Sequence, residues 1–288
     1  MSNKVNNKNK KILVVGLGLI GSSLCRSLRK NNSYDNINGH DISKEVMEYA
    51  LDNNYIDNFE LDLGNAIEDS DIIVFCVPVD QIKNLLKIAK PFFNGNKVFT
   101  ETLSTKKTVL DFIKDNKFQD VNNFILSHPM AGTENFGIKN SLDNLYDEAI
   151  TFISPLDSSK LDNINSVKYL WESINCNVVE IDTLKHDKIL AAISHAPHAI
   201  SFSLSKMIND LNTNEKFPWI YSKGSLSDMT RISNSDPESW ANIFSDNEVN
   251  IIEYINKYIE ELKELKSKIS SKNHDDIVSF LNRSNPKK

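Results

Sequence analysis

Several features that mark whole classes of protein are scarce in this sequence. Among 288 residues there are only three cysteines, Cys25, Cys76 and Cys176, an odd number set far apart. This count argues against a disulfide framework and against a zinc cluster, and it favours a reducing compartment such as the cytoplasm. No stretch approaches the roughly 18 uncharged apolar residues of a membrane-spanning helix, so no membrane partner is expected.

An excess of basic residues is also missing. The chain has 33 Lys and Arg against 39 Asp and Glu, a formal net charge of −6, and its acidic residues are spread along its length. Nucleic-acid binding requires a clustered basic face, so no nucleic-acid partner is expected. The polar first eleven residues lack the apolar segment of a signal peptide. A small anionic substrate remains compatible with this charge, because one or two arginines or a helix N-terminus can bind it.

The first half of the chain contains a regular alternation of two patterns. Short apolar runs typical of strands recur at 11–15, 37–40, 71–77, 97–101, 124–127 and 149–154. Apolar residues at helical spacing lie between most of these runs. We expect Ser43 to cap a helix that runs to Leu51, and Ser104 to cap one that reaches Ile113. Strands alternating with helices predict an α/β fold, a Rossmann-type doubly wound parallel sheet.

The second half has a different character. After one more short strand at 177–181, the pattern is helical to the C-terminus. The domain boundary is therefore expected at Pro155, with a dinucleotide-binding domain at 1–155 and an all-α domain at 156–288. One helix of about 25 residues carries an apolar stripe, formed by Ile252, Ile255, Ile259, Leu262 and Ile269. This stripe either packs on the chain's own core or meets its counterpart in a homodimer.

A glycine loop follows the first predicted strand. Gly16, Gly18 and Gly21 have the spacing G-x-G-x-x-G and open a predicted helix. In this setting the first glycine permits the turn, the second lets the backbone approach a pyrophosphate, and the third lets helix and strand pack closely. The helix N-terminus, with Leu19 and Ile20, offers N–H groups to the phosphates.

The second predicted strand ends near a carboxylate. Asp41 lies twenty residues after Gly21, where it can accept hydrogen bonds from the ribose hydroxyls of NAD and would repel the 2′-phosphate of NADP. NAD is therefore the expected cofactor. The alternative is a local role for Asp41 beside the helix cap Ser43. Val77 and Pro78, where the third long strand ends, are expected to complete the cofactor site.

Four polar clusters follow the glycine loop. They are Ser104, SHPMAGTE at 127–134, SHAPH at 194–198, and GSLSDMTRIS at 224–233 with Trp240 downstream. His128 ends a strand on the edge where open α/β sheets bind ligands, and a neutral imidazole there can accept a hydroxyl proton. A structural turn residue is the alternative interpretation.

The histidine and arginine of the later clusters are also candidate ligands. His195 and His198 share one helix face, but no cysteine or carboxylate pattern completes a zinc site, and hydride transfer to NAD needs no Lewis acid. No metal is therefore expected. The planar guanidinium of Arg231 suits bidentate binding of a carboxylate, with an ordinary salt bridge as the alternative.

Together these motifs resemble the prephenate/arogenate dehydrogenase family of tyrosine biosynthesis. The likeness runs from Lys11 to beyond Trp240 and includes GLGLIGSSL, SHPMAGTE, SHAPH and DMTRI in the family's order. The resemblance implies NAD-dependent oxidative decarboxylation, either of prephenate to 4-hydroxyphenylpyruvate and CO₂ or of arogenate to tyrosine. It also implies an N-terminal dinucleotide domain and a helical C-terminal dimerisation domain. Which of the two substrates is preferred stays open.

The resemblance assigns roles to individual residues. His128 would accept the proton of the ring hydroxyl, with Ser104 orienting both groups. Substrate-binding roles fall to four residues: His198 and Arg231 for a carboxylate, Glu134 for the side chain, and Trp240 for the pocket shape. One departure puts the role of Ser104 in doubt. The family has Asp, a small residue and Gly before this serine, whereas Leu103 precedes it here and cannot freely adopt a positive φ.

Two competing functions remain open. A β-hydroxyacid dehydrogenase of the 3-hydroxyisobutyrate type would carry a Lys-x-x-x-Asn pair on a helix, but here Lys188 is followed four residues later by Ala192. A non-enzymatic NAD-sensing regulator would keep the fold without the chemistry. About 20 residues follow the long helix, so no appended regulatory domain is expected, and any feedback by tyrosine would act at the active site.

Overall fold

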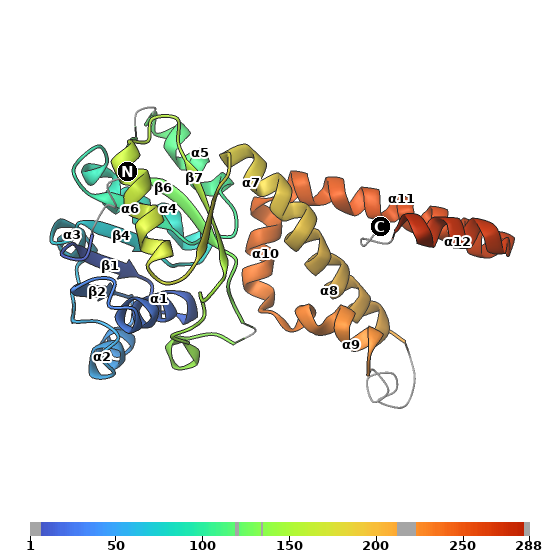
Figure 1. Ribbon diagram of the computed structural model, residues 1–288, viewed down its shortest axis with the longest axis horizontal. Coiled ribbons are helices and arrows are strands. Elements are labelled where there is room, and N and C mark those ends of the chain that lie inside the picture. Colours follow the sequence, from blue (N-terminus) through green and yellow to red (C-terminus); the bar gives the residue numbers. More distant parts are fainter. Residues whose placement is uncertain (1–6, 119–120, 134, 212–222, 285–288) are drawn as a thin grey trace. The chain divides into compact units, whose positions relative to one another are not determined.

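The protein forms two compact units in the computed structural model (Figure 1). The structure describes residues 7–118, 121–133, 135–211 and 223–284. Unit 1 comprises Met1–Ile189 and Asn234–Asp246, and unit 2 comprises Leu190–Ser233 and Asn247–Lys288. This division by compactness does not coincide with the functional boundary expected at residue 155, which stays a prediction.

Unit 1 is built on a five-stranded parallel sheet with the order β3-β2-β1-β4-β5. Its strands are β1 (Lys11–Val15), β2 (Asn36–His40), β3 (Asn58–Phe59), β4 (Ile72–Phe75) and β5 (Val98–Glu101). The helices that follow them are α1 (Leu19–Lys30), α2 (Lys44–Asp52), α3 (Leu63–Glu68), α4 (Val79–Ala89), the short η1 (Lys90–Phe92) and α5 (Lys107–Asp115). The predicted Rossmann-type sheet is confirmed.

The sheet has a separate hydrophobic core on each face. Val14 and Val74 belong to the core that also contains Leu24 of α1. Their neighbours Leu13 and Ile73 belong to the core on the other face, with helices α4 and α5. Because side chains alternate along a strand, a sheet covered on both faces requires apolar residues at every position of its central strands. This explains the unbroken runs ILVV and IIVF.

A second sheet continues unit 1 beyond the fifth strand. It contains β6 (Ile125–Pro129), β7 (Ile150–Pro155) and β8 (Asn177–Glu180), with η2 (Ile138–Asn140) and α6 (Leu161–Glu172) between them. Strands β6 and β7 are antiparallel, a reversal that the apolar runs did not predict. A single parallel bridge between Phe99 and Phe124 sets the start of β6 beside β5. The ends of β5 and β6 therefore lie at the same edge.

Two further helices belong to unit 1, and the regular elements of unit 2 are all helices within its described residues. Unit 1 also contains α7 (Thr183–Leu190) for most of its length, and α10 (Pro237–Asp246). The helices of unit 2 are the π-helical turn η3 (Ala191–His195), α8 (Ala196–Asn209), α9 (Ser225–Thr230), η5 (Arg231–Asn234, whose last residue is in unit 1), α11 (Glu248–Ser271) and α12 (His274–Arg283). The predicted all-α C-terminal part is confirmed. Within the described ranges, no helix combines the length and apolar character needed to cross a membrane.

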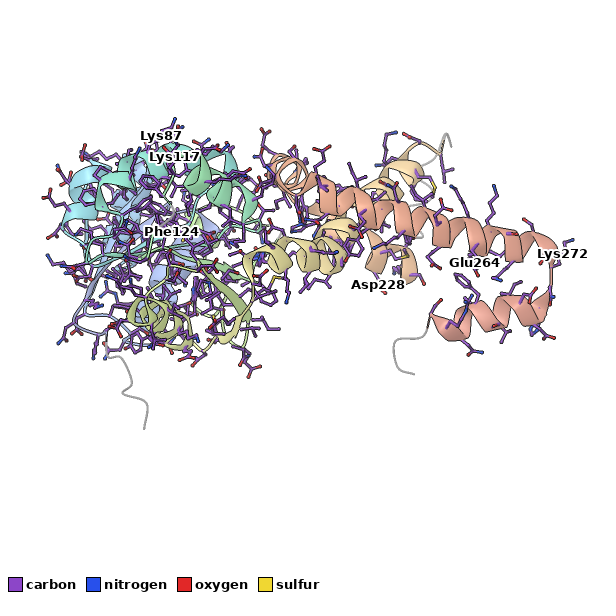
Figure 2. The ribbon with its side chains drawn as sticks, turned by 90° about the horizontal axis from the view of Figure 1, so that it is seen from above. Lys87, Lys117, Phe124, Asp228, Glu264 and Lys272 are labelled. Carbon is purple, nitrogen blue, oxygen red and sulfur yellow. The ribbon has the colours of Figure 1, made fainter. Side chains whose placement is uncertain are left out.

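The long helix α11 and the shorter α12 form a hairpin. Lys272, in the left-handed conformation with φ 54°, ends α11 where the chain turns back, as Figure 2 shows. An ion pair of 3.0 Å between Arg283 and Glu264 joins the two helices. Most of the predicted apolar stripe of α11 faces solvent in this single chain: Ile252, Ile259, Leu262 and Ile269 are 40–56% exposed.

Candidate active site

The glycine loop has the geometry that a dinucleotide requires. Gly16 has φ +91°, which an L side chain rarely adopts. A Cβ on Gly21 would lie 1.9 Å from the carbonyl oxygen of Gly16, so only glycine lets α1 begin this close to the turn. By contrast, a Cβ on Gly18 would have nothing within 4 Å. Gly18 thus leaves open space beside the N-terminus of α1, which has no side-chain cap. A pyrophosphate fits such a cradle.

Asp41 is bound directly to this loop. One carboxylate oxygen accepts the Leu17 N–H at 2.7 Å and the other accepts the Ser43 N–H at 2.9 Å. Each carboxylate oxygen has a second lone pair that can accept a ribose hydroxyl. The local role beside Ser43 and the proposed cofactor role are therefore compatible. Ser43 also caps α2, as predicted, by accepting the Val46 N–H at 3.4 Å.

The other expected cofactor residues surround the same loop. Leu19 is buried and Ile20 is half-buried in the first turn of α1. Val77 packs on the turn, since its Cγ1 lies 2.8 Å from where a Cβ of Gly16 would be. Pro78 is exposed and precedes α4.

His128 lies in β6 and is 7% exposed. Its Nδ1 is 3.0 Å from Nε2 of His186, a fully buried residue of α7. Nδ1 of His186 is in turn 2.7 Å from Oδ1 of Asp187. The histidine expected to accept a proton is thus the first member of a buried His–His–Asp chain.

The Asp187 carboxylate closes this chain at the start of α5. It accepts the backbone N–H of Lys106, at 2.9 and 3.1 Å to its two oxygens, and that of Lys107 at 3.1 Å. The prediction that Ser104 caps this helix is wrong, because the N-cap position is Lys106 and has no side-chain cap of its own. A carboxylate from a distant helix supplies the acceptor that a local serine was expected to provide.

A buried ion pair supports the loop that carries Ser104. Nζ of Lys106 is 2.7 Å from Oε1 of Glu101, and neither side chain is exposed. The other oxygen of Glu101 accepts the Leu103 N–H at 2.5 Å. Burial raises the pKa of Glu101, and the Lys106 ammonium opposes that shift. Leu103 is not among the described residues with positive φ, so the loop forms without the family's glycine.

The same ammonium ties the Ser104 loop to the His128 strand. Lys106 donates to the carbonyl oxygens of Leu103 and Ser127, both at 2.8 Å. Leu103 immediately precedes Ser104, and Ser127 immediately precedes His128. Ser104 is half-buried. One buried cation therefore binds the backbone directly before each of the two predicted catalytic residues.

A second predicted cluster lies within unit 2. Nδ1 of His198 is 2.9 Å from the carbonyl oxygen of Ser194, in the turn before α8. Burial lowers the pKa of His198, and the neighbouring Arg231 guanidinium lowers it further. Ser201 of α8 donates to the Met229 carbonyl at 2.8 Å and fixes α9 near Arg231. An exposed cation beside a neutral imidazole is suited to binding a carboxylate.

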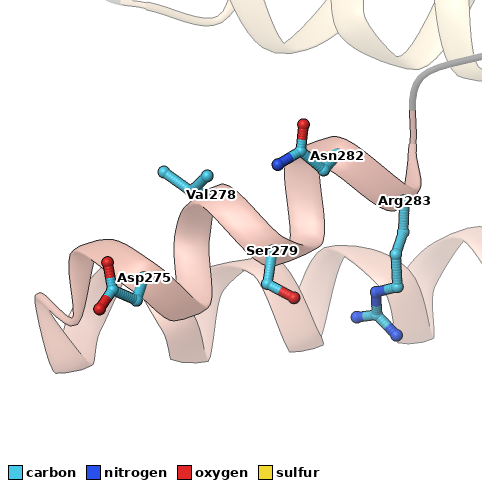
Figure 3. Close-up of a pocket in the computed structure, with 5 residues that line it drawn as sticks. All are labelled: Asp275, Val278, Ser279, Asn282 and Arg283. Carbon is cyan, nitrogen blue, oxygen red and sulfur yellow. The ribbon is translucent and has the colours of Figure 1, made fainter.

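The remaining predicted residues are less informative. Trp240 is half-buried on α10, with its ring centroid 5.5 Å from that of Phe244. Glu134 lies outside the described residues. His195 is buried beside Asn247, whose amide nitrogen is 3.0 Å from the His195 Nδ1. The hollow in Figure 3 is lined only by residues of α12, among them Asp275 and Arg283, and contains none of the predicted site residues.

Sequence reasoning missed four residues of this site. Glu101 and Lys106 had a usable signal, because two opposite charges flank a loop directly after an apolar strand. His186 and Asp187 had only a weak one, a His-Asp dipeptide within the helical segment LKHDKIL. Neither pair could be linked to His128 from spacing alone, because His186 lies 58 residues from His128 and Lys106 lies 21 residues from Ser127.

Comparisons with known proteins agree with this geometry. The profile of the family "Prephenate dehydrogenase, nucleotide-binding domain" matches residues 24–180, and "Prephenate dehydrogenase, dimerization domain" matches residues 182–283. The cyclohexadienyl dehydrogenase of Zymomonas mobilis is 29% identical over 276 residues, covering 96% of this chain and 94% of that protein.

Solved structures give the same result. The prephenate dehydrogenase from A. aeolicus, in complex with hydroxyphenyl propionate and NAD⁺, matches with a TM-score of 0.87 and 29% identity over 96% of each chain. The Synechocystis arogenate dehydrogenase matches with a TM-score of 0.78 and 25% identity over 95% of this chain and 97% of that one. The family expected from the four motifs is confirmed: the chain belongs to the prephenate dehydrogenase family.

Proposed function

We propose that this protein catalyses the NAD-dependent oxidative decarboxylation of prephenate to 4-hydroxyphenylpyruvate and CO₂, or of arogenate to tyrosine. Relatives that are named prephenate, cyclohexadienyl and arogenate dehydrogenases support this reaction class. The observation that carries the proposal is the buried His128 at the sheet edge, backed by His186 and Asp187. Family membership argues against the 3-hydroxyisobutyrate type and against a non-enzymatic regulator.

NAD is the cofactor of this activity. The open cradle at Gly18 and the carboxylate of Asp41 support it, as does the NAD⁺ in the A. aeolicus relative. When bound, NAD⁺ supplies the hydride acceptor. Gly16, Gly21 and Val77 shape the turn that would hold the pyrophosphate against the N-terminus of α1.

His128 is the proposed proton acceptor. The ring hydroxyl of the substrate transfers its proton to the imidazole while the carbon that bears the hydroxyl loses a hydride and the ring carboxylate leaves as CO₂. Aromatisation of the ring drives this step. The imidazolium then returns the proton to the phenolate oxygen, which gives the phenol of the product. Ser104 is the proposed orienting group for the hydroxyl and His128, since Lys106 binds the residue before each of them.

Substrate recognition is assigned to a second set of residues. Arg231 and His198 would bind a substrate carboxylate, a role that the local charge near α8 supports. Trp240 would shape the pocket. Glu134 would influence recognition of the side chain, the only part in which prephenate and arogenate differ.

We further propose that residues 1–155 bind the dinucleotide and that residues 156–288 carry substrate-binding and dimer contacts. The exposed apolar stripe of α11 supports a homodimer, because contiguous exposed apolar surface commonly marks an interface. The family's dimerization profile on residues 182–283 supports it too. A cytoplasmic location is consistent with three cysteines that are all buried and free of disulfides.

The proposed function is tested by steady-state kinetics of NADH formation with prephenate and with arogenate, each with NAD⁺ and with NADP⁺. We expect turnover with at least one substrate and a preference for NAD⁺. His128→Asn should retain NAD binding while losing roughly 10²–10⁴-fold in turnover, the usual contribution of a general base. Undiminished turnover in this variant would exclude His128 as the proton acceptor.

A further inference from the structure

The buried partner of His128 determines which of its two nitrogens can accept a proton. Asp187 is surrounded by donors, because its carboxylate accepts the backbone N–H groups of Lys106 and Lys107 at the start of α5. These charge-assisted bonds and the positive end of the helix dipole favour the ionised carboxylate. An ionised carboxylate only accepts hydrogen bonds. The 2.7 Å contact with His186 therefore requires a proton on Nδ1 of His186.

The protonation of His186 is then transmitted to His128. A neutral imidazole has one donor and one acceptor nitrogen, so a proton on Nδ1 makes Nε2 of His186 the acceptor. This Nε2 lies 3.0 Å from Nδ1 of His128, which must then be the donor. From this geometry we infer that His186 and Asp187 are positioning residues that hold His128 in the Nδ1–H tautomer, so that Nε2 is the nitrogen that accepts the substrate's proton.

The packing around His186 supports this fixed arrangement. Phe152 lies opposite His128 in the antiparallel pair of β6 and β7, and its ring meets the ring of His186 edge-on at a centroid distance of 5.9 Å. The rings of His186 and His128 are also edge-on, at 5.1 Å. His186 is completely buried, so both its position and its orientation are constrained by neighbours.

The same chain stabilises the product of the proton transfer. The substrate O–H bond breaks and an Nε2–H bond forms on His128, which becomes an imidazolium, while the electron pair of the adjacent C–H bond leaves with the hydride to NAD⁺. The Nδ1–H of His128 remains donated to His186 throughout. The Asp187 carboxylate, oriented through His186, favours the new positive charge at His128.

The tautomer can be read directly by ¹⁵N NMR of the full chain labelled with [¹⁵N]histidine and saturated with NAD⁺. The chain has six histidines, and loss of one signal in His128→Asn assigns His128. At a pH where His128 is neutral, we expect a protonated Nδ1 and an unprotonated Nε2. A protonated Nε2 would overturn the inference, as it would mean that Nε2 of His186 donates to Nδ1 of His128.

Asp187→Asn provides the sharpest perturbation. The side-chain oxygen of the introduced asparagine can still accept the Lys106 N–H, but its amide NH₂ would face His186 and reverse the tautomers of both histidines. We expect a protonated Nε2 on His128 and a loss in kcat of roughly 10³–10⁴-fold, with little change in NAD affinity. Asp182→Asn is the matched control, because Asp182 caps the same helix through Leu184 and Lys185 and should leave kcat unchanged.

A pair of variants at the middle residue keeps the inference testable if Asp187→Asn is poorly folded. The amide of His186→Gln can accept from His128 and donate to Asp187, whereas His186→Leu can do neither. We expect the Gln variant to keep at least tenfold more turnover than the Leu variant, with KM values within a few-fold of each other. Equal turnover in two folded variants would contradict the positioning role.

This inference rests on His128 being the proton acceptor, but the two proposals fail in different ways. If His128→Asn keeps its turnover, the proposed function of His128 fails whatever its tautomer. If His128→Asn is inactive but Asp187→Asn retains wild-type kcat, only the positioning role fails. The NMR measurement needs no turnover and therefore tests the tautomer independently.

Discussion

The ammonium of Lys106 lies 2.7 Å from a carboxylate oxygen of Glu101, and both side chains are completely buried. Two backbone carbonyls complete the coordination of the ammonium, and two backbone N–H groups bind the carboxylate. The pair and its backbone partners form a polar network on both sides of Ser104 and directly before His128 in the sequence. Such a pair is costly to break, since removal of one partner leaves an uncompensated buried charge.

We therefore predict that Glu101→Gln lowers the free energy of unfolding by about 3–5 kcal/mol. The measurement is urea unfolding followed by circular dichroism. Replacing both partners, as in Glu101→Gln with Lys106→Met, should recover part of this loss. Asp69→Asn is a matched control, because its exposed ion pair with Lys11, at 2.6 Å, should contribute less than about 1 kcal/mol. Equal effects at the two sites would contradict the prediction.

Substitutions at two glycines of the loop should affect folding and cofactor binding differently. Gly21→Ala places a Cβ against the Gly16 carbonyl, so we expect a loss of about 1–3 kcal/mol or more in stability as well as weaker NAD binding. Gly18→Ala meets open space and should change stability by less than about 1 kcal/mol. It should nevertheless weaken NAD binding, because the methyl group occupies the approach of the pyrophosphate. Thermal unfolding and calorimetric titration with NAD⁺ measure both effects.

Asp41 is expected to discriminate between the two nicotinamide cofactors. Removing its charge in Asp41→Asn removes the repulsion of a 2′-phosphate and weakens binding of the ribose hydroxyls. The ratio of kcat/KM for NADP⁺ to that for NAD⁺ should rise at least about tenfold, equivalent to roughly 1.4 kcal/mol. Asp62→Asn is the control, since Asp62 only caps α3 through Asn65. An unchanged ratio in Asp41→Asn would limit this residue to its structural contacts with Leu17 and Ser43.

If the exposed apolar stripe of α11 is the dimer interface, a charge at its centre should weaken the dimer. Ile259→Glu should shift the proposed homodimer to monomer in analytical ultracentrifugation at micromolar concentration, because burying an unpaired carboxylate in an apolar interface costs several kcal/mol. Lys257→Glu introduces the same side chain two residues away, on the opposite face of the helix, and should leave the dimer intact. Dissociation by both variants, or by neither, would argue against this stripe as the interface.

Local patterns in the sequence predicted the fold well. The strand expected at 11–15 is β1, the expected cap Ser43 does cap α2, and the glycine loop opens α1, because each depends on neighbours within a few residues. The prediction of a Ser104 cap failed for the opposite reason. An acceptor from Asp187, 81 residues from Lys106, binds the helix N-terminus instead, and no spacing rule detects such a contact.

The candidate site was also predicted only where local sequence determines the structure. His128 was predicted from its place at the end of a strand, since parallel strands end at a common ligand-binding edge. Its partner His186 was not, because a buried histidine in a short helix has no distinguishing periodicity. The neighbouring charges Glu101 and Lys106 were assigned no role in the site. Tertiary packing, not local sequence, determines which of these polar residues meet.

The pH behaviour of His198 follows from its surroundings. Burial and the Arg231 guanidinium both lower its pKa from the ordinary value of 6.5. Between the folded and unfolded pKa values the unfolded chain binds more protons, so this residue's contribution to stability is complete above 6.5 and is lost as the pH falls through the lowered pKa. Because His198 is about half exposed, the contribution to stability is small.

Arg231→Gln should therefore raise the pKa of His198 towards its ordinary value, as followed by ¹H NMR of the imidazole C–H signals. The same variant should lower kcat/KM for the substrate by more than tenfold, because a carboxylate loses a charged partner that contributes about 1.5–3 kcal/mol. Lys206→Gln is the control, since Lys206 pairs with Asp210 at the exposed C-terminal end of α8, the helix that contains His198, and should change neither quantity. If the pKa of His198 stays lowered in Arg231→Gln, burial alone lowers it. That result would contradict the prediction that the Arg231 guanidinium acts on His198.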